Sequence, residues 1–109
     1  MKSHIEEFRK YLIGEKNASP HTVSSYLRDI RQFQSFLEES RHACDESGIH
    51  LNQLDRTAVR SYMGYLYDRS NSGATMGRKL SSLSTFFKFL CREGHLKTNF
   101  AKTIPLPKK

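Results

Sequence analysis

Apolar side chains recur at the spacing of an α-helix in four successive segments of this 109-residue chain. We expect helices over about residues 3–15, 20–39 and 74–93, and one more that begins after Asp55 and ends before Asn71. No segment shows the sustained polar and apolar alternation of a strand. Because each amphipathic helix must bury its apolar face against other elements, the sequence predicts an all-α fold. The length fits one domain, a bundle of four to five helices.

Each segment contributes one apolar stripe to the predicted core. The stripes are Ile5, Phe8, Tyr11 and Leu12; Val23, Tyr26, Leu27, Ile30, Phe33 and Leu37; Val59, Tyr62, Met63, Leu66 and Tyr67; and Met76, Leu80, Leu83, Phe87 and Leu90. Phe86 and Phe89 fall off the last stripe. We interpret them as core residues, with contact to a partner domain as the alternative.

Capping residues define the expected helix ends. Ser19 precedes Pro20, the pattern of an N-cap followed by proline at the first helical position. Asp55 and Ser72 are the expected N-caps of the third and fourth helices. Gly94 follows the fourth helix as a C-terminal stop.

The remaining segments are polar or rich in proline. Residues 40–54 form a polar connection that we expect to be anchored to the core by Ile49, Leu51 and Leu54. Residues 97–101 are expected to add one more turn. The proline-containing segment 104–109 is typical of the start of a linker, so that the helical domain would span residues 1–103.

The chain is strongly basic, with 18 Lys and Arg against 11 Asp and Glu and a net charge of +7. For so small a domain this excess favours a polyanionic partner, with nucleic acid ahead of anionic lipid, although a basic solvated surface has the same composition. No apolar run approaches the ~18 residues of a membrane span, and residues 1–10 have no signal-peptide pattern. Cys44 and Cys91 fit free thiols in a reducing cytoplasm better than a disulfide.

The position of the charge is more specific than its sum. The outward faces of the second and fourth segments are expected to be rich in basic and hydroxyl side chains and free of carboxylates, with Asp29 to one side. Such side chains neutralise phosphates and reach base edges. A solvated helix face is the alternative for either stripe alone. The predicted DNA-binding residues are His21, Thr22, Ser24, Ser25, Arg28, Arg31, Gln32, Thr75, Arg78, Lys79, Ser81, Ser82, Thr85 and Lys88.

Two stretches resemble a known family. Residues 19–33, SPHTVSSYLRDIRQF, are similar to the S-P-x-T-x-x-x-Y-x-x-D-[LI]-x-x-F run of Xer-type tyrosine recombinases and phage integrases. Residues 78–83, 86–90 and 92–94 (RKLSSL, FFKFL and REG) resemble a later segment of the same family. The likeness covers nearly the whole chain in the correct order. Two departures are the connection at 40–52, which is longer than usual, and Phe100 where the family has proline.

The resemblance implies the SAM-like core-binding domain of a tyrosine recombinase, an orthogonal bundle of four to five helices that forms one half of a clamp around duplex DNA. In that family two crossing helices of this domain enter the major groove, and the matching segments here are the second and fourth. The implied partners are double-stranded DNA, a C-terminal catalytic domain of the parent protein and other recombinase subunits on DNA. The implied location is cytoplasmic and associated with the nucleoid, with no membrane partner.

The catalytic groups of that family are not found in this sequence. None of the five His has an Arg three residues later, and the five Tyr fall at helical, mostly core positions. The sequence also shows no phosphate-binding loop or metal-ligand spacing, so we expect no cofactor, no metal and no catalysis by this chain alone. The alternative to DNA binding is a helical protein-interaction module that docks an acidic partner.

Overall fold

The computed structural model describes residues 1–105 and confirms the all-α prediction. The helices are α1 (Lys2–Gly14), α2 (Pro20–Ser40), α3 (Arg56–Asp68) and α4 (Gly73–Arg92). Two short strands, β1 (Cys44–Asp45) and β2 (Gly48–Ile49), and a 3-10 turn, η1 (Leu51–Gln53), lie between α2 and α3. Each helix is amphipathic, as the sequence pattern predicts.

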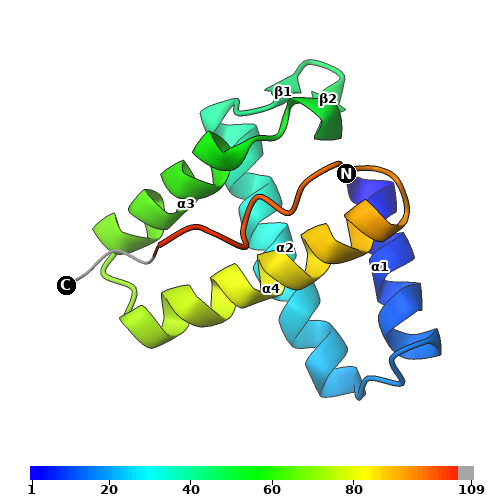
Figure 1. Cartoon of the computed structure of the whole chain (residues 1–109). Coiled ribbons are helices and arrows are strands. Elements are labelled where there is room, and N and C mark those ends of the chain that lie inside the picture. The colour runs from blue at the N-terminus through cyan, green and yellow to red at the C-terminus, as the bar shows by residue number, and fades with distance from the viewer. Residues whose placement is uncertain (106–109) are drawn as a thin grey trace.

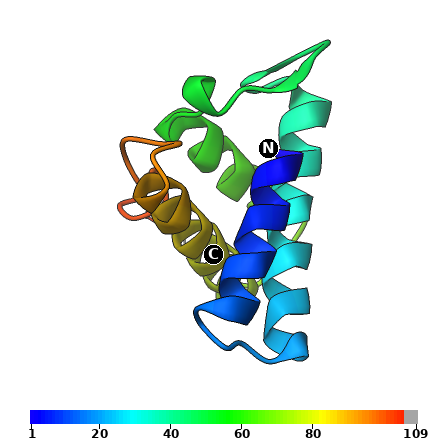
Figure 2. The ribbon, with the colours of Figure 1, turned by 90° about the vertical axis from the view of Figure 1, so that its right-hand side faces the viewer.

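The four helices form two crossed layers (Figures 1 and 2). In Figure 2, α1 and α2 lie side by side and antiparallel, and α3 and α4 form the other layer. The longest helix, α2, packs against each of the other three, and α4 crosses it near the middle of the molecule (Figure 1). The side of α2 that faces α4 is therefore set by this crossing, which positions the candidate site.

Aromatic rings join all four helices in the core. The Phe8 ring of α1 lies 5.2 Å from Phe86 of α4, whose neighbour Phe87 lies 6.0 Å from Phe33 of α2 (centroid distances). Phe33 in turn lies 5.2 Å from Tyr62 of α3. All five side chains are fully buried. Contacts between rings of this kind add to the stabilisation from burial itself.

The three predicted N-caps are confirmed. The side-chain oxygens of Ser19, Asp55 and Ser72 accept hydrogen bonds from the third residue beyond each of them, at 3.2, 2.9 and 3.1 Å. Each bond satisfies one backbone N–H that the helix itself leaves free. Beyond α4, Gly94 has φ +82°, a left-handed conformation that glycine adopts without strain, so the predicted stop is also confirmed.

The core differs from the predicted stripes at a few positions. Phe86 and Phe89 are 0% and 5% exposed, which confirms the core interpretation. Tyr67 is 37% exposed, so its assignment to the core is wrong: it lies at the edge of the α3 stripe, in the last turn, one residue beyond the buried Leu66. Phe36, which the stripe of α2 omitted, is buried.

The connection between α2 and α3 contains a small hairpin that the sequence did not predict. Cys44 and Asp45 pair antiparallel with Ile49 and Gly48. A ladder of two residues per strand is too short to show alternation. The hairpin stands at the end of the molecule where α2 ends (Figure 1). The predicted anchors are confirmed, since Leu54 is buried and Ile49 and Leu51 are partly buried against the core.

The segment after α4 folds back along the bundle and runs over the outer face of the layer formed by α3 and α4 (Figures 1 and 2). Leu96, Ala101 and Ile104 are buried. The Asn99 side-chain amide donates to the Ser84 carbonyl oxygen at 3.1 Å, and a turn follows at residues 100–103, close to the predicted one. The core therefore includes Ile104, so its assignment to the linker is wrong, and residues 106–109 of that linker lie outside the described residues.

Both cysteines are free and half-buried, as predicted. Within residues 1–105, no group of three or more His, Cys, Asp or Glu side chains is arranged to hold a metal ion. None of the helices in this range has the length and apolar character needed to span a bilayer.

Candidate nucleic-acid interface

A groove of about 250 Å³ lies between α2 and α4, and we call it the α2–α4 groove. Its lining residues are His21, Thr22, Ser25, Tyr26 and Asp29 from α2, and Arg78, Ser81 and Ser82 from α4. All except Tyr26 and Asp29 belong to the predicted DNA-binding set. The crossing of the two helices therefore brings together hydrogen-bonding groups that are about 50 residues apart in the sequence.

A buried carboxylate forms the floor of this groove. Asp29 is 2% exposed, and its two oxygens accept hydrogen bonds from Nη1 of Arg78 at 3.0 and 2.8 Å. Oδ2 of Asp29 also accepts from the Ser82 hydroxyl at 2.8 Å. Pairing with a cation and a hydroxyl offsets the cost of burying the charge. Asp29 thus links α2 to α4 at their crossing.

This network corrects two sequence-based expectations. Ser82 is 4% exposed, so its predicted place on the outward face of α4 is wrong. Asp29 does not lie to one side of the basic surface but beneath it. Both errors have the same cause: α4 crosses α2 over these residues, and a projection of one isolated helix does not show which flank its neighbour covers.

A second polar contact continues the α2–α4 groove. Nζ of Lys79 donates to Oε1 of Gln32 at 2.6 Å. The pKa of Lys79 is lowered, first by desolvation and further by the positive charges of Arg78 and Arg28, while Asp29 acts in the opposite direction. Arg28 lies one helical turn before Gln32 on α2, and Arg78 adjoins Lys79 on α4, so the three cations lie near the same crossing. The predicted residues Arg28, Gln32 and Lys79 therefore lie beside the α2–α4 groove.

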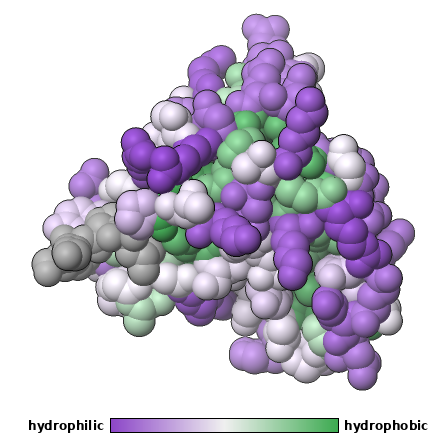
Figure 3. Space-filling view, viewed as in Figure 1, coloured by the Kyte–Doolittle hydropathy of each residue, from purple (hydrophilic) through white to green (hydrophobic). Residues whose placement is uncertain are grey.

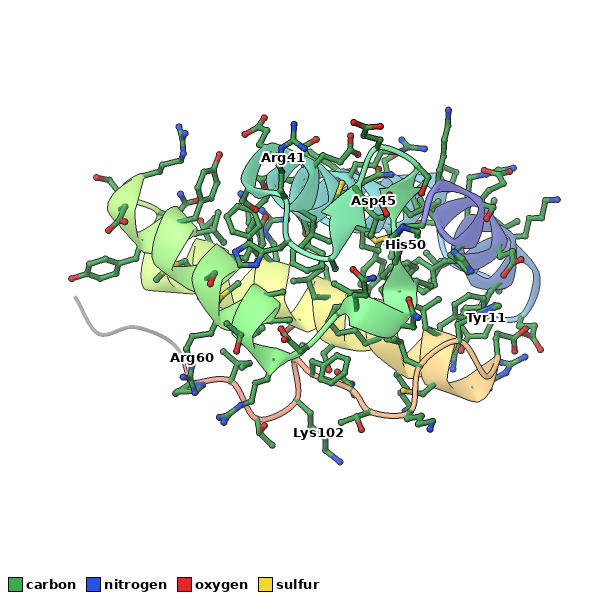
Figure 4. The ribbon with its side chains drawn as sticks, turned by 90° about the horizontal axis from the view of Figure 1, so that it is seen from above. Tyr11, Arg41, Asp45, His50, Arg60 and Lys102 are labelled. Atoms are coloured by element: carbon green, nitrogen blue, oxygen red, sulfur yellow. The ribbon has the colours of Figure 1, made fainter. Side chains whose placement is uncertain are left out.

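The predicted residues nearer the end of α4 line a different groove, of about 310 Å³, between α1 and α4. We call it the α1–α4 groove; it is lined by Tyr11, Lys16, Thr85, Lys88, Phe89 and Arg92. The guanidinium of Arg92 lies 4.9 Å from the Tyr11 ring centroid and is also paired with Glu15 at 2.8 Å. Figure 4 shows Tyr11 between α1 and the end of α4. The sequence prediction missed Lys16 as a neighbour of Thr85 and Lys88, and it placed Arg92 on the same outward face of α4 without including it among the DNA-binding residues.

Arg31 lies apart from both grooves. It lines a cavity of about 720 Å³ beside the start of α1, together with Met1, Lys2, Ser3, Ile5, Glu6 and Gln34. The pKa of Glu6 is lowered chiefly by its hydrogen bond with Arg9, and the charge of Arg31 contributes to the shift. The structure thus places Arg31 on the α1 side of α2.

Ser24 is exposed on α2, and Thr75 is half-buried in the first turn of α4, where its N–H donates to the Ser72 cap. Within residues 1–105, no hydrogen bond joins the Ser24 side chain to a residue of either groove.

The surface offers little broad apolar area. In the view of Figure 3, hydrophilic residues surround the hydrophobic surface that shows in the middle of this face. Among residues 1–105, the large hydrophobic side chains classed as exposed are Ile13 and Tyr67, which belong to different helices. The α2–α4 groove is lined by Tyr26 and residues with polar or charged groups, and the α1–α4 groove by three cationic residues, Thr85 and two aromatic rings. Such a surface suits a polar, anionic ligand better than an apolar one.

The Asp29 and Tyr26 side chains were not among the predicted site residues, yet both line the α2–α4 groove. The signal that could have indicated them is the Tyr-x-x-Asp-Ile run within residues 19–33. Periodicity placed Tyr26 in the core, where it is partly buried.

The chain covers about a third of the length of the curated proteins that it matches. It is 33% identical to the tyrosine recombinase XerC of Natranaerobius thermophilus over 100% of this chain and 35% of that protein. It is 36% identical to the XerC of Syntrophus aciditrophicus, over 95% of this chain and 34% of that protein. The XerD of Staphylococcus saprophyticus is 30% identical over 99% of this chain and 35% of its own length.

No solved structure matches the chain. The family described as "Phage integrase, N-terminal SAM-like domain" matches residues 5–94, a range that includes all four helices apart from the first turn of α1. This match confirms the family resemblance seen in the two motifs. The chain belongs to the phage integrase N-terminal SAM-like domain family.

Proposed function

We propose that this chain binds duplex DNA through the α2–α4 groove and the cationic side chains beside it, as the N-terminal domain of a site-specific tyrosine recombinase. Strand exchange would be catalysed by a separate C-terminal domain. This chain would form one half of a clamp around the DNA and would position the DNA for that chemistry. The names of the relatives and the family membership support the recombination role.

The observation that carries the proposal is the charge arrangement at the α2–α4 groove. Arg28 lies one turn before Gln32 on α2, Gln32 contacts Lys79, and Arg78 adjoins Lys79 on α4. The carboxylate among the lining residues, Asp29, is buried and paired. An exposed carboxylate would repel phosphate, whereas a buried and paired one does so much less. Arginine, lysine and hydroxyl groups are the side chains that contact phosphates and base edges.

The other end of the proposed surface is the α1–α4 groove, which Lys88 reaches from the same outward face of α4. Lys16 and Arg92 add positive charge there, and Glu15 partly offsets it through its ion pair with Arg92. We therefore assign the strongest backbone contacts to Arg28, Lys79 and Lys88. Arg31 is expected to contribute through its charge more than through direct contact, because it lies on the α1 side of α2.

Charge reversal tests this assignment with a matched control. The double variant Arg28→Glu/Lys88→Glu should lose at least tenfold in affinity for a duplex of random sequence, measured by fluorescence anisotropy. The control Arg60→Glu/Lys102→Glu changes the net charge equally. Both control residues are exposed, and Figure 4 shows them on the side of α3 and the C-terminal segment. The control should bind within about threefold of the unmodified chain.

Salt dependence gives a second readout. If about six phosphates are neutralised, the logarithm of the binding constant should fall with the logarithm of salt concentration with a slope near −5. The double variant should have a slope shallower by about 2, since each phosphate contact contributes about 0.9. Absence of duplex binding by the unmodified chain, or an equal loss in the control, would contradict the proposal.

A further inference from the structure

We propose that Arg78 is a base-reading residue, held by Asp29 in the orientation that recognises guanine in the major groove. This inference rests on the proposed function and assigns a specific role within it. It divides the interface into two parts. Arg78 forms a rigid centre that recognises base sequence, and Arg28 and Lys88 form a cationic rim that contacts phosphates. The contacts of Arg78 and the charge of its pair with Asp29 support this role, and the composition of the α2–α4 groove is compatible with it.

The guanidinium of Arg78 is engaged by the protein at one nitrogen. Nη1 donates to both oxygens of Asp29, and no hydrogen bond is formed by Nε or Nη2 with any acceptor within residues 1–105. These two nitrogens lie on one edge of the planar group and form the fork that matches two adjacent acceptors. The N7 and O6 atoms of guanine are such a pair, and a bidentate arginine contact with them is the commonest specific contact in protein–DNA complexes.

The same pairing makes Arg78 a poor phosphate anchor. Its positive charge lies 2.8 Å from the Asp29 carboxylate, so the pair carries little net charge toward a distant phosphate. Arg28 and Lys88 have no ion pair with a described carboxylate within 4.0 Å, and both are exposed. Long-range attraction therefore falls to these cations. Arg78 contributes two hydrogen-bond donors, Nε and Nη2, in a fixed orientation.

Orientation is largely settled before DNA binds. The Arg78 side chain is 46% exposed, but its head group is held against Asp29, which Ser82 fixes in turn. Ordering a free arginine on binding costs rotamer freedom, and a side chain already held in place avoids part of this cost. A fixed donor pair also discriminates better than a mobile one, because it cannot swing to a neighbouring phosphate.

The surroundings of Arg78 suit a base edge. His21, Thr22, Ser25 and Ser81 line the same groove, and all of them can donate or accept hydrogen bonds without a permanent charge. Groups of this kind reach the base edges beside a guanine as well as phosphate oxygens. The neutral lining is therefore compatible with a role in sequence recognition for this part of the interface.

The test begins with selection of preferred duplexes from a randomised pool by the unmodified chain. A guanine that is selected strongly is then replaced by 7-deazaguanine, which removes the N7 acceptor and keeps the base pair. The substitution should weaken binding by the unmodified chain by roughly tenfold, the order expected for a bidentate contact. Arg78→Lys keeps the charge and loses the planar fork. Its ammonium can still reach O6 when N7 is missing, so the variant should bind the two duplexes within about threefold of each other.

Asp29→Asn tests whether the pair with Asp29 orients Arg78. Lys88→Gln is the control, at a residue that is expected to contact phosphate. Asp29→Asn should bind guanine and 7-deazaguanine duplexes within about threefold of each other, with a salt slope steeper by up to about 0.9, because the released arginine can contact a phosphate. Lys88→Gln should keep the tenfold preference, bind all duplexes more weakly and have a shallower slope. Circular dichroism measures folding, and Arg78→Lys alone tests the base contact should Asp29→Asn unfold.

The outcomes separate the two proposals. A chain that binds no duplex contradicts the proposed function itself. A chain that binds duplexes but selects no guanine, or whose folded Arg78→Lys variant keeps the full preference for N7, overturns the base-reading role alone. Loss of the preference in Arg78→Lys together with its retention in Lys88→Gln supports it.

Discussion

The carboxylate of Asp29 and the guanidinium of Arg78 form an asymmetric pair. Asp29 is 2% exposed and Arg78 is 46% exposed, although the two groups lie within 3.0 Å of each other. The anion therefore depends on its partner for solvation, whereas the cation also has access to water. Removal of either residue breaks the same contact but leaves a very different group behind.

Arg78→Met should accordingly destabilise the fold more than Asp29→Asn does. The methionine variant leaves a buried carboxylate with the Ser82 hydroxyl as its remaining donor, and breaking a buried pair in this way costs about 3 kcal/mol. The double variant Arg78→Met/Asp29→Asn should regain part of that loss. Urea denaturation of the three variants and the unmodified chain at neutral pH measures this double-mutant cycle. Equal losses in the two single variants would contradict the asymmetry.

The N-caps of α2 and α4 should make similar contributions to stability. In each, a serine accepts a backbone hydrogen bond from a threonine three residues later and lies 3.0 Å from that hydroxyl. Ser72→Ala and Ser19→Ala should each lower the free energy of unfolding by about 1 kcal/mol. Ser35→Ala, an exposed change inside α2, is the control and should lie within about 0.5 kcal/mol of the unmodified chain. Chemical denaturation gives all three values.

Tyr62→Phe should increase stability. The Tyr62 hydroxyl is buried without a hydrogen-bond partner within residues 1–105, and burial is the main cause that raises the pKa of this phenol well above its ordinary value. Removing a buried, unsatisfied hydroxyl relieves a cost of about 1 kcal/mol. Tyr65→Phe, at a partly buried position on the same helix, is the matched control and should change stability little. A lower thermal midpoint for Tyr62→Phe would show that the hydroxyl has a partner in solution.

The hairpin should show an unusually acidic carboxyl group. The pKa of Asp45 is lowered to about 2, first by the hydrogen bond from the Ser47 hydroxyl and then by His50, which faces it across the hairpin (Figure 4). Since the folded-state pKa is depressed below the ordinary value of 3.8, the carboxylate favours the folded hairpin above about pH 4. That contribution is lost as the pH falls toward 2.

An NMR titration of the Asp45 carboxyl carbon checks this prediction. Ser47→Ala should move the Asp45 midpoint upward toward 3.8, because it removes the largest cause of the shift. Thr57→Ala, an exposed change in α3, should leave the midpoint in place. An Asp45 midpoint near 3.8 in the unmodified chain would show that the hairpin contacts do not persist in solution.

The helices and their caps could be predicted from the sequence because they depend on local features. Ser19, Asp55 and Ser72 each bond a backbone N–H three residues away, and the apolar stripes repeat within a few turns. The hairpin at residues 44–49 could not be predicted in this way, since its ladder is too short for a pattern of alternation to appear.

The candidate site was only partly predictable, because its decisive contacts join distant residues. Arg78 and Asp29 are 49 positions apart, and Ser82 and Asp29 are 53 apart. Periodicity locates the polar side of each helix but not the flank that a crossing helix covers. For this reason Ser82 is buried against expectation, and Arg31 lies toward α1. The family motif contained Asp29, but its role became evident only from the crossing of α2 and α4.

The aromatic chain from Phe8 to Tyr62 has a consequence for how the domain melts. Each helix supplies at least one of these rings, so detaching any one helix separates an edge-on pair. Partial opening of α1 alone would expose Phe8 together with Phe86. The slowest-exchanging amide hydrogens should therefore be found in all four helices with similar protection, as in a single cooperative unit, and should not be confined to one stable pair.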